Sequence, residues 1–297
     1  MFFRIILTLL VLGATVTNAA EHNTLLGFLE EHRGAYAGKA NFRTVRVVFY
    51  KDGRAWRTFP SNCQTQKCLQ SIAPEYKPTV VWTIAFDGRK LGQVTGRAPD
   101  QFGFYSQAGL QEITSKSSIP TVGDKSIEFT DDRQYRPLVA NSHAYFKDPE
   151  TWKPSRLSTN VVSLLRQQFR QKLPKLCKQS TLDESKLEPF EYGNDDITLA
   201  KAYTSKRGWS LARLHLAGAI DCNDLEAGFE INDPWFVVDP RMSVQYLDEA
   251  LSLVDAGDYD DDGKSELVFA INGDNRGGYK LFYDDFKRSA VFEFGYH

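Results

Sequence analysis

Alternating hydrophobic and polar residues run through most of the chain and predict a β-rich protein. Residues Val45–Phe59 and Val80–Val94 each contain two alternating runs around an Asp-Gly pair, which begins at Asp52 in the first segment and at Asp87 in the second. Asp-Gly adopts the positive φ angles that two-residue hairpin turns require. Each segment is therefore expected to form a β-hairpin.

Short apolar or alternating runs between turn residues predict further strands. They cover residues 109–113, 126–129, 138–140, 197–205, 208–218, 234–239, 252–256, 266–271, 279–286 and 289–297. The last four follow one another across short turns, so they predict a four-stranded antiparallel meander.

Two segments have helical spacing instead. In Asn23–Arg33 the asparagine is a candidate cap, Gly34 a candidate end, and the apolar residues recur three and four positions apart. In the second segment, 158–174, Ser158 or Thr159 is the candidate cap and Pro174 ends the helix. Its predicted apolar face consists of Val162, Leu165, Phe169 and Leu173, and its other face carries Arg166, Arg170 and Lys172, which we expect to be a solvated surface.

The first twenty residues, MFFRIILTLLVLGATVTNAA, have the layout of a secretory signal peptide. One Arg precedes an apolar run from Ile5 to Val16, and Ala19 and Ala20 supply the small residues of a cleavage site. A membrane anchor needs roughly 20 apolar residues, which this run does not reach. We expect a periplasmic or secreted protein with no membrane span, whose residues 21–297 form a single β-rich domain.

The four cysteines are Cys63, Cys68, Cys177 and Cys222, an even number in a chain predicted to be exported. Oxidising compartments favour disulfides, and the spacing lacks the paired C-x-x-C of a zinc site. Three pairings are possible. Proximity in the sequence favours Cys63 with Cys68, which leaves Cys177 for Cys222.

Charge and motifs narrow the function classes. The formal net charge is −2, which gives no electrostatic footprint for nucleic acid. The chain contains no G-x-S-x-G, H-E-x-x-H or phosphate-binding glycine loop. His215 alternates with apolar neighbours, and we interpret it as structural. No catalytic residue is assigned, although Asp131, Asp132 and Glu230 are candidate acids for glycoside hydrolysis.

One acidic stretch, AGDYDDDGKSEL, predicts a metal site. Asp258, Asp260, Asp262 and Glu266 occupy positions 1, 3, 5 and 9 of a loop with Gly263 at position 6. Alternate spacing in a tight loop turns these carboxylates inward, and the main-chain carbonyl of Lys264 is a further expected ligand. Several hard oxygen ligands suit Ca²⁺. An acidic turn without an ion is the alternative.

The flanking sequence excludes an EF-hand. That loop needs an acid at position 12, which here is Phe269, and it needs helices on both sides. Here SLVDA precedes the loop and ELVFAI follows it, and both segments are strand-like.

A D-x-D-x-D-G-x-x-E loop between two strands resembles the calcium loop of FG-GAP/VCBS-type repeats, the blades of integrin-α-like β-propellers. Asp258, Asp260, Asp262, Gly263 and Glu266 carry the resemblance, together with the Leu-Val that follows them. The family usually has Asp at the ninth position, so the role of Glu266 is the least secure. The resemblance covers about residues 254–286 and implies that residues 243–297 form a four-stranded, blade-like unit.

The predicted fold is therefore all-β, with propeller-like antiparallel meanders and one or two short helices; a β-sandwich with one calcium hairpin is the alternative. We expect a calcium-binding scaffold that acts as a binding module for a protein or glycan. A secreted hydrolase acting on glycans or related polymers is the second hypothesis. Aromatic residues crowd the last two strands, and most of them are expected to be core: Tyr279, Phe282, Tyr283, Phe286, Phe292, Phe294 and Tyr296.

Overall fold

The computed structural model describes residues 24–32, 42–60, 62–63, 65–74, 77, 79–99, 110–113, 119, 137–143, 146–181, 186–222, 231–273 and 276–295. This part of the chain is mostly β, with two helices, which confirms the all-β prediction. The predicted signal peptide and the strand candidate at 126–129 lie outside these residues.

The first sheet contains seven strands: β1 (Leu25–His32), β2 (Phe42–Asp52), β3 (Ala55–Thr58), β4 (Val80–Phe86), β5 (Arg89–Pro99), β6 (Leu110–Ile113) and β7 (Leu138–Asn141). We call it the N-terminal sheet. Its order is β1-β7-β4-β5-β6-β2-β3, and β1 also pairs with β2, so the sheet curls back on itself. Both predicted hairpins, β2–β3 and β4–β5, are confirmed.

The middle of the chain forms a five-stranded sheet and a smaller three-stranded one. The five-stranded sheet contains β8 (Lys153–Pro154), β11 (Thr198–Thr204), β12 (Ser210–His215), β14 (Trp235–Val238) and β15 (Val244–Asp248). The three-stranded sheet contains β9 (Leu176–Gln179), β10 (Leu187–Pro189) and β13 (Ile220–Asp221).

The last four strands form the predicted meander, which we call the C-terminal sheet: β16 (Leu251–Gly257), β17 (Glu266–Gly273), β18 (Arg276–Tyr283) and β19 (Arg288–Gly295). The unit begins at Leu251, because the preceding strand, β15, pairs with β14 in the five-stranded sheet.

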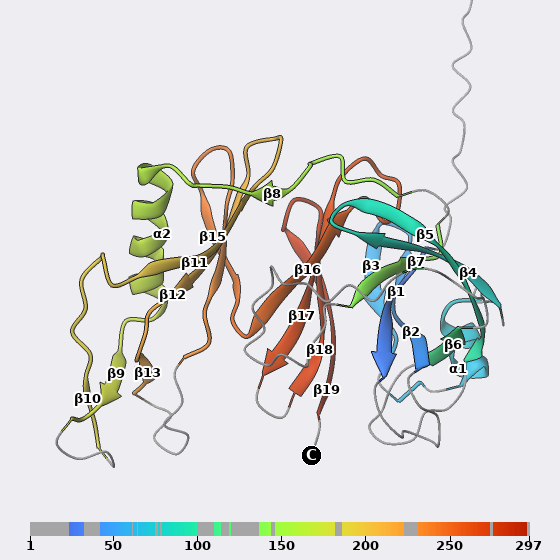
Figure 1. Cartoon of the computed structure of the whole chain (residues 1–297), viewed down its shortest axis with the longest axis horizontal. Coiled ribbons are helices and arrows are strands. Elements are labelled where there is room, and N and C mark those ends of the chain that lie inside the picture. The colour runs from blue at the N-terminus through green and yellow to red at the C-terminus, as the bar shows by residue number, and fades with distance from the viewer. Residues whose placement is uncertain are drawn as a thin grey trace, which may run out of the picture.

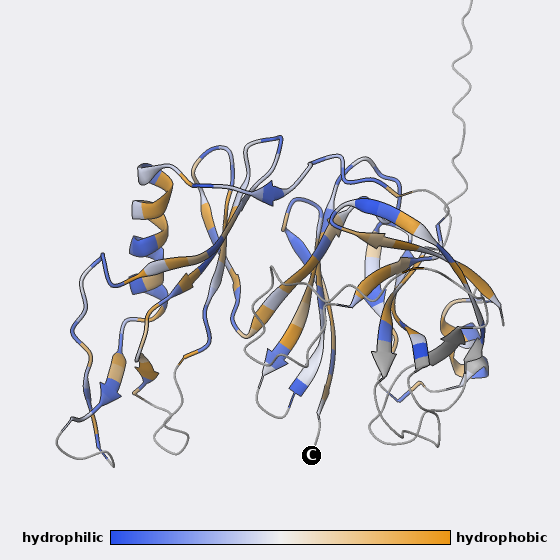
Figure 2. Ribbon diagram, in the orientation of Figure 1, coloured by the Kyte–Doolittle hydropathy of each residue, from blue (hydrophilic) through white to orange (hydrophobic). Residues whose placement is uncertain are grey.

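The C-terminal sheet is a central layer (Figure 1). Its strands β16, β17 and β18 are covered on both faces, whereas β19 is covered on one face only. On β17, Val268 and Ala270 pack into the core of the N-terminal sheet. Leu267, Phe269 and Ile271 point the other way and pack with the five-stranded sheet. Figure 2 shows that hydrophobic residues run along these central strands.

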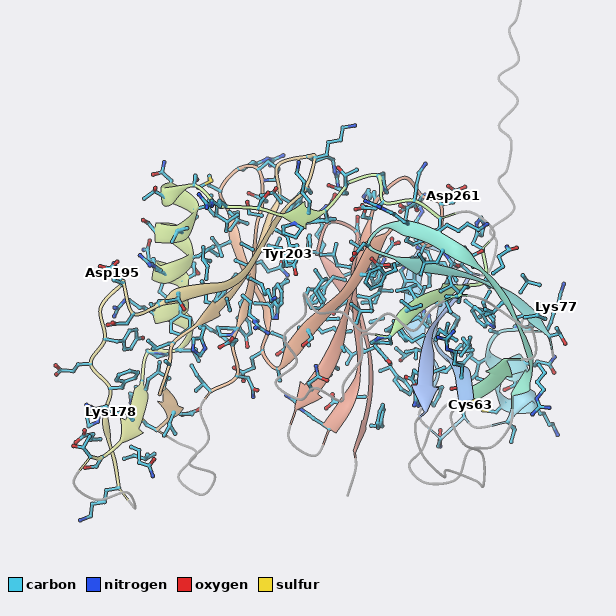
Figure 3. The ribbon with its side chains drawn as sticks, viewed as in Figure 1. Cys63, Lys77, Lys178, Asp195, Tyr203 and Asp261 are labelled. Atoms are coloured by element: carbon cyan, nitrogen blue, oxygen red, sulfur yellow. A yellow bond between two sulfur atoms is a disulfide. The ribbon has the colours of Figure 1, made fainter. Side chains whose placement is uncertain are left out.

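Aromatic rings connect these layers. The rings of Phe28 and Tyr279 stack with centroids 3.6 Å apart between the N-terminal and C-terminal sheets. On the other side, Phe269 packs edge-on against Trp235 at 5.3 Å, and Tyr203 lies between the two sheets (Figure 3). The aromatic residues at the chain end therefore fill cores, as expected; Tyr296 lies outside the described residues.

The helix predicted at Asn23–Arg33 is wrong, because Leu25–His32 is strand β1. It pairs with β2 on one side and β7 on the other, and Leu25, Leu26, Phe28 and Leu29 are all buried. A short apolar run fits one face of a helix and a strand buried on both faces equally well, so spacing alone could not distinguish them.

The second helix is confirmed as α2 (Thr159–Lys172), with Ser158 as its cap. Its buried residues are Val161, Leu165 and Phe169. The predicted apolar face is correct for Leu165 and Phe169, but Val162 and Leu173 are only partly buried, and Val161 takes the place of Val162. The helix covers the outer face of the five-stranded sheet (Figure 1).

The basic face of α2 is bonded within the chain rather than simply solvated. The Nε of Arg166 donates to the carbonyl of Ile197, and Arg170 donates to the carbonyl of Tyr192 while its guanidinium lies over the Tyr192 ring. The ammonium group of Lys172 lies 4.3 Å from the centroid of the Tyr246 ring. Arg166 and Arg170 thus hold the segment before β11 against the helix, and Lys172 contacts β15.

The favoured cysteine pairing is the one found. Cys63 is bonded to Cys68, beside helix α1 (Gln66–Ile72), and Cys177 is bonded to Cys222. The second bond joins β9 to the turn after β13 and closes a loop with a sequence separation of 45 residues, against 5 for the first.

We predict that the Cys177→Ser/Cys222→Ser variant loses about 4 kcal/mol of unfolding free energy, because the bond restricts a long loop in the unfolded chain. The matched Cys63→Ser/Cys68→Ser variant should lose less, about 2 kcal/mol. Urea denaturation followed by tryptophan fluorescence measures both. Equal losses would contradict the loop-length explanation.

Candidate cation site

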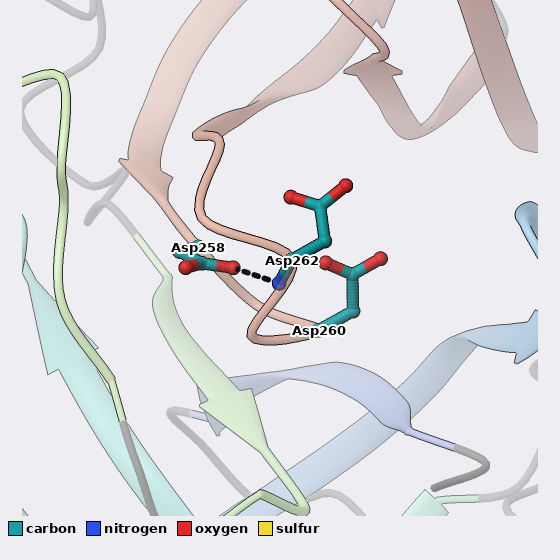
Figure 4. A group of neighbouring side chains, drawn as sticks. All are labelled: Asp258, Asp260 and Asp262. Atoms are coloured by element: carbon teal, nitrogen blue, oxygen red, sulfur yellow. Dashed lines mark hydrogen bonds between the residues drawn. The ribbon is translucent and has the colours of Figure 1, made fainter. Parts of the chain in front are cut away.

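The predicted metal loop, residues 258–265, connects β16 to β17, and Gly257 pairs with Glu266 at its base. It lies at one end of the C-terminal sheet on the side of the N-terminal sheet, where Figure 3 labels Asp261. Asp258, Asp260 and Asp262 each offer one carboxylate oxygen, and these three oxygens lie within 4.8 Å of one another (Figure 4). We call these residues the aspartate trio.

Hydrogen bonds within the loop fix this arrangement. The two carboxylate oxygens of Asp258 accept from the backbone N–H groups of Asp262 and Gly263, both at 3.0 Å. Asp262 in turn accepts from the N–H of Lys264 at 2.9 Å. Gly263 has a φ of 85°, a backbone conformation that glycine adopts without strain. The glycine at position 6 therefore does what the sequence pattern predicted.

Burial makes the charges of the loop costly. Asp258 is 2% exposed, and loss of hydration raises its pKa to about 6, although the N–H of Gly263 opposes the rise. Asp260 and Asp262 raise the pKa of Asp258 further by repulsion. Burial also raises the pKa of Glu266 well above its usual value, and the charge of Asp260 adds to this. A positive charge among these groups would reverse both effects.

One positive charge is already present. The ammonium group of Lys51, on β2 of the N-terminal sheet, contacts Oδ2 of Asp260. The Asp260 side chain is 4% exposed. Its other oxygen, Oδ1, is buried and accepts no hydrogen bond from the described residues. Asp260 therefore has one oxygen neutralised by lysine and one available for another cation.

Glu266 has a different position from the one predicted for a ligand. It does not belong to the group of converging carboxylates. Its Oε2 accepts from the N–H of Tyr259 at 2.9 Å, so it fastens the start of the loop to β17. Lys264, predicted to offer its carbonyl, directs its ammonium group to Asp284 at 3.1 Å and Asp285 at 3.7 Å.

Residues distant in sequence hold the loop in place. Asn141, at the end of β7, donates from its side chain to the carbonyl of Tyr259 at 2.8 Å. The N–H of Asp258 donates to the carbonyl of Lys147 at 2.7 Å. The rings of Phe146 and Tyr259 stack with centroids 5.5 Å apart. A Cβ on Gly257 would lie 2.5 Å from the Phe146 ring, so this position has no room for a side chain. Sequence reasoning found none of these contacts, because no local pattern encodes them.

The donor set fits a calcium-sized cation. Ca²⁺ binds oxygens at 2.3–2.6 Å, so two oxygens on opposite sides of it lie roughly 4.6–5.2 Å apart. The spread of the aspartate trio falls within that distance. Carboxylates are also the ligands that hard divalent cations prefer.

Other candidates give no second site. His215 bonds through Nδ1 to Asp233 at 2.8 Å, and Arg213 contacts the same aspartate, which agrees with a structural role for the histidine. The candidate hydrolase acids Asp131, Asp132 and Glu230 lie outside the described residues.

No protein-family model, curated protein or solved structure matches the chain. The resemblance of the loop to FG-GAP/VCBS-type repeats therefore stays a prediction from its motif. None of the helices in the described ranges has the length and hydropathy needed to span a bilayer.

We predict that Glu266→Gln keeps the response of the protein to calcium, because the amide oxygen still accepts from Tyr259 while the buried charge is removed. Asp258→Asn, which takes one charge out of the aspartate trio, should abolish that response. The measurement is the melting temperature with and without CaCl₂. Loss of the response in Glu266→Gln would show that Glu266 is a ligand after all.

Proposed function

We propose that the protein is an exported β-scaffold whose 258–266 loop binds Ca²⁺, and that it acts as a binding module for a protein or a glycan. One observation carries the cation assignment. Oδ1 of Asp260 is buried and has no hydrogen-bond partner among the residues that the structure describes, and it lies beside the carboxylates of Asp258 and Asp262. A buried carboxylate oxygen in that state costs free energy, and a bound cation would remove the cost.

Three side chains would hold the ion: Asp258, Asp260 and Asp262, with main-chain carbonyls and water completing its shell. When bound, the ion supplies positive charge that offsets the repulsion among buried acids. The chain's own contribution is rigidity. Asp258 already orders the turn through two backbone hydrogen bonds, and Glu266 fixes Tyr259.

Export is supported by the two disulfides as well as by the signal-like first twenty residues. Disulfides persist in oxidising compartments and are rare where thiols are kept reduced. Calcium-binding modules outside the cell typically have dissociation constants of roughly 0.1–1 mM, which suits a loop of three carboxylates.

We prefer a binding role to catalysis because the side chains of the 258–266 loop form hydrogen bonds that order the backbone and connect sheets. The acids of the loop are engaged in that bonding. The hydrolase hypothesis depends on acids outside the described residues, and no contact within the described ranges favours it.

We predict that Ca²⁺ at 100 times its dissociation constant raises the melting temperature by about 5 °C, because binding to the folded state alone contributes about 2.7 kcal/mol. EDTA should reverse the shift. Asp260→Ala should remove it, since that substitution deletes the buried, unpartnered oxygen. Differential scanning fluorimetry measures all three results.

Asp261→Asn is the matched control for this experiment. Asp261 lies in the same loop but is exposed, lies outside the aspartate trio and has a φ of 59°, which asparagine tolerates. This variant should keep the full calcium response. No shift in the wild type, or the same shift in Asp260→Ala, would overturn the cation assignment.

A further inference from the structure

We propose that Lys51 is a built-in counter-charge of the cation loop, which keeps the loop folded without a metal and lowers the loop's affinity for one. This inference rests on the proposed cation site. It assigns a role to a residue of the N-terminal sheet that lies 209 positions before Asp260 in the sequence.

The position of the Lys51 ammonium group is fixed by its own sheet and by Tyr283 of β18. Lys51 pairs with Trp56 across the β2–β3 hairpin, and its N–H donates to the carbonyl of Thr24 at 2.8 Å. The ammonium group lies 5.3 Å from the centroid of the Trp56 ring and 5.9 Å from that of Tyr283. With 14% of its side chain exposed, Lys51 is a held charge rather than a mobile surface lysine.

Asp260 connects this charge to the loop. Its Oδ2 contacts the ammonium group, while its buried Oδ1 accepts no hydrogen bond from the described residues. The lysine therefore compensates part of the charge of the aspartate trio and leaves one oxygen for a metal. A metal on Oδ1 and an ammonium group on Oδ2 would share a single carboxylate and repel each other, because little water separates charges at that depth.

The other lysine near the loop does not play this part. Lys264 belongs to the loop itself, but its ammonium group pairs with Asp284 and Asp285 in the turn between β18 and β19. The ammonium group of Lys51, by contrast, contacts Asp260 of the aspartate trio. Its charge comes from a different sheet than the loop that it neutralises.

Calcium affinity and metal-free stability should therefore move in opposite directions when Lys51 is replaced. In Lys51→Met, we expect calcium to bind at least about tenfold tighter, because tenfold is on the order of the repulsion between close charges screened by bulk water, and the protein screens them less. The melting temperature in EDTA should fall by several degrees, because the acids lose their internal partner, and saturating calcium should recover most of that loss. Isothermal titration with CaCl₂ and thermal melting of the full chain measure the two effects.

Lys280→Met is a matched control. Lys280 lies on β18, its side chain is 13% exposed, and its ammonium group pairs with Asp248 at 2.7 Å. Lys280 is therefore buried to a similar extent as Lys51 and also pairs with an aspartate, although a more exposed one, and it pairs outside the loop. This variant should lose stability in EDTA without a change in calcium affinity. If Lys51→Met does not fold without metal, Lys51→Gln, which keeps a donor to Asp260, carries the same expectation.

The outcomes separate this inference from the proposed function. Equal or weaker calcium binding in Lys51→Met, with binding in the wild type, overturns the role of Lys51 and leaves the cation site standing. Binding in Lys51→Met alone supports the inference and shows that lysine excludes the metal from the native loop. Binding in neither protein overturns both proposals.

Discussion

The burial of the first three strands of the C-terminal sheet on both faces is the constraint on which the rest of the structure depends. Its strands carry apolar side chains that alternate between two different cores, one shared with the N-terminal sheet and one with the five-stranded sheet. The N-terminal sheet and the five-stranded sheet must therefore each pack against the C-terminal sheet to bury their own apolar faces. This packing closes both faces of β16, β17 and β18 to a ligand, which leaves edges, loops and the outer face of β19, where Val291 is 42% exposed.

Polar contacts give this layered packing a specific register. Arg46 of β2 forms a bidentate pair with Glu30 of β1 at 2.8 Å, and the hydroxyl of Tyr279 on β18 donates to the same carboxylate at 2.7 Å. A buried ion pair adds little net stability compared with apolar packing, but a misplaced partner leaves a charge uncompensated. The pair therefore penalises a displaced pairing of β1 with β2, and the Tyr279 hydroxyl extends this selectivity to the position of β18.

The sequence predicted correctly those elements whose formation depends on interactions within a single segment. The Asp-Gly hairpins, α2 and the final meander depend on turn chemistry, capping and periodicity within single segments. Strand β1 was mistaken for a helix because only its neighbours β2 and β7 reveal that both its faces are buried. In the loop, the sequence identified the three aspartates whose carboxylates converge. The backbone partner of Glu266 depends on the folded turn and could not be predicted, and its role as a ligand stays a prediction. Lys51 could not be found at all, since the contact spans 209 positions.

The position of the loop explains why its charge matters beyond the turn itself. Tyr259 bonds to Asn141 of the N-terminal sheet, Asp258 to the carbonyl of Lys147, and the Ser265 hydroxyl donates to Asp148 at 2.5 Å. Asp148 in turn accepts from the N–H of Trp152, whose ring packs with the five-stranded sheet. The loop thus joins the N-terminal sheet, the C-terminal sheet and the segment that leads to the five-stranded sheet. Free energy gained by neutralising its acids therefore stabilises contacts between layers, whichever positive charge supplies it.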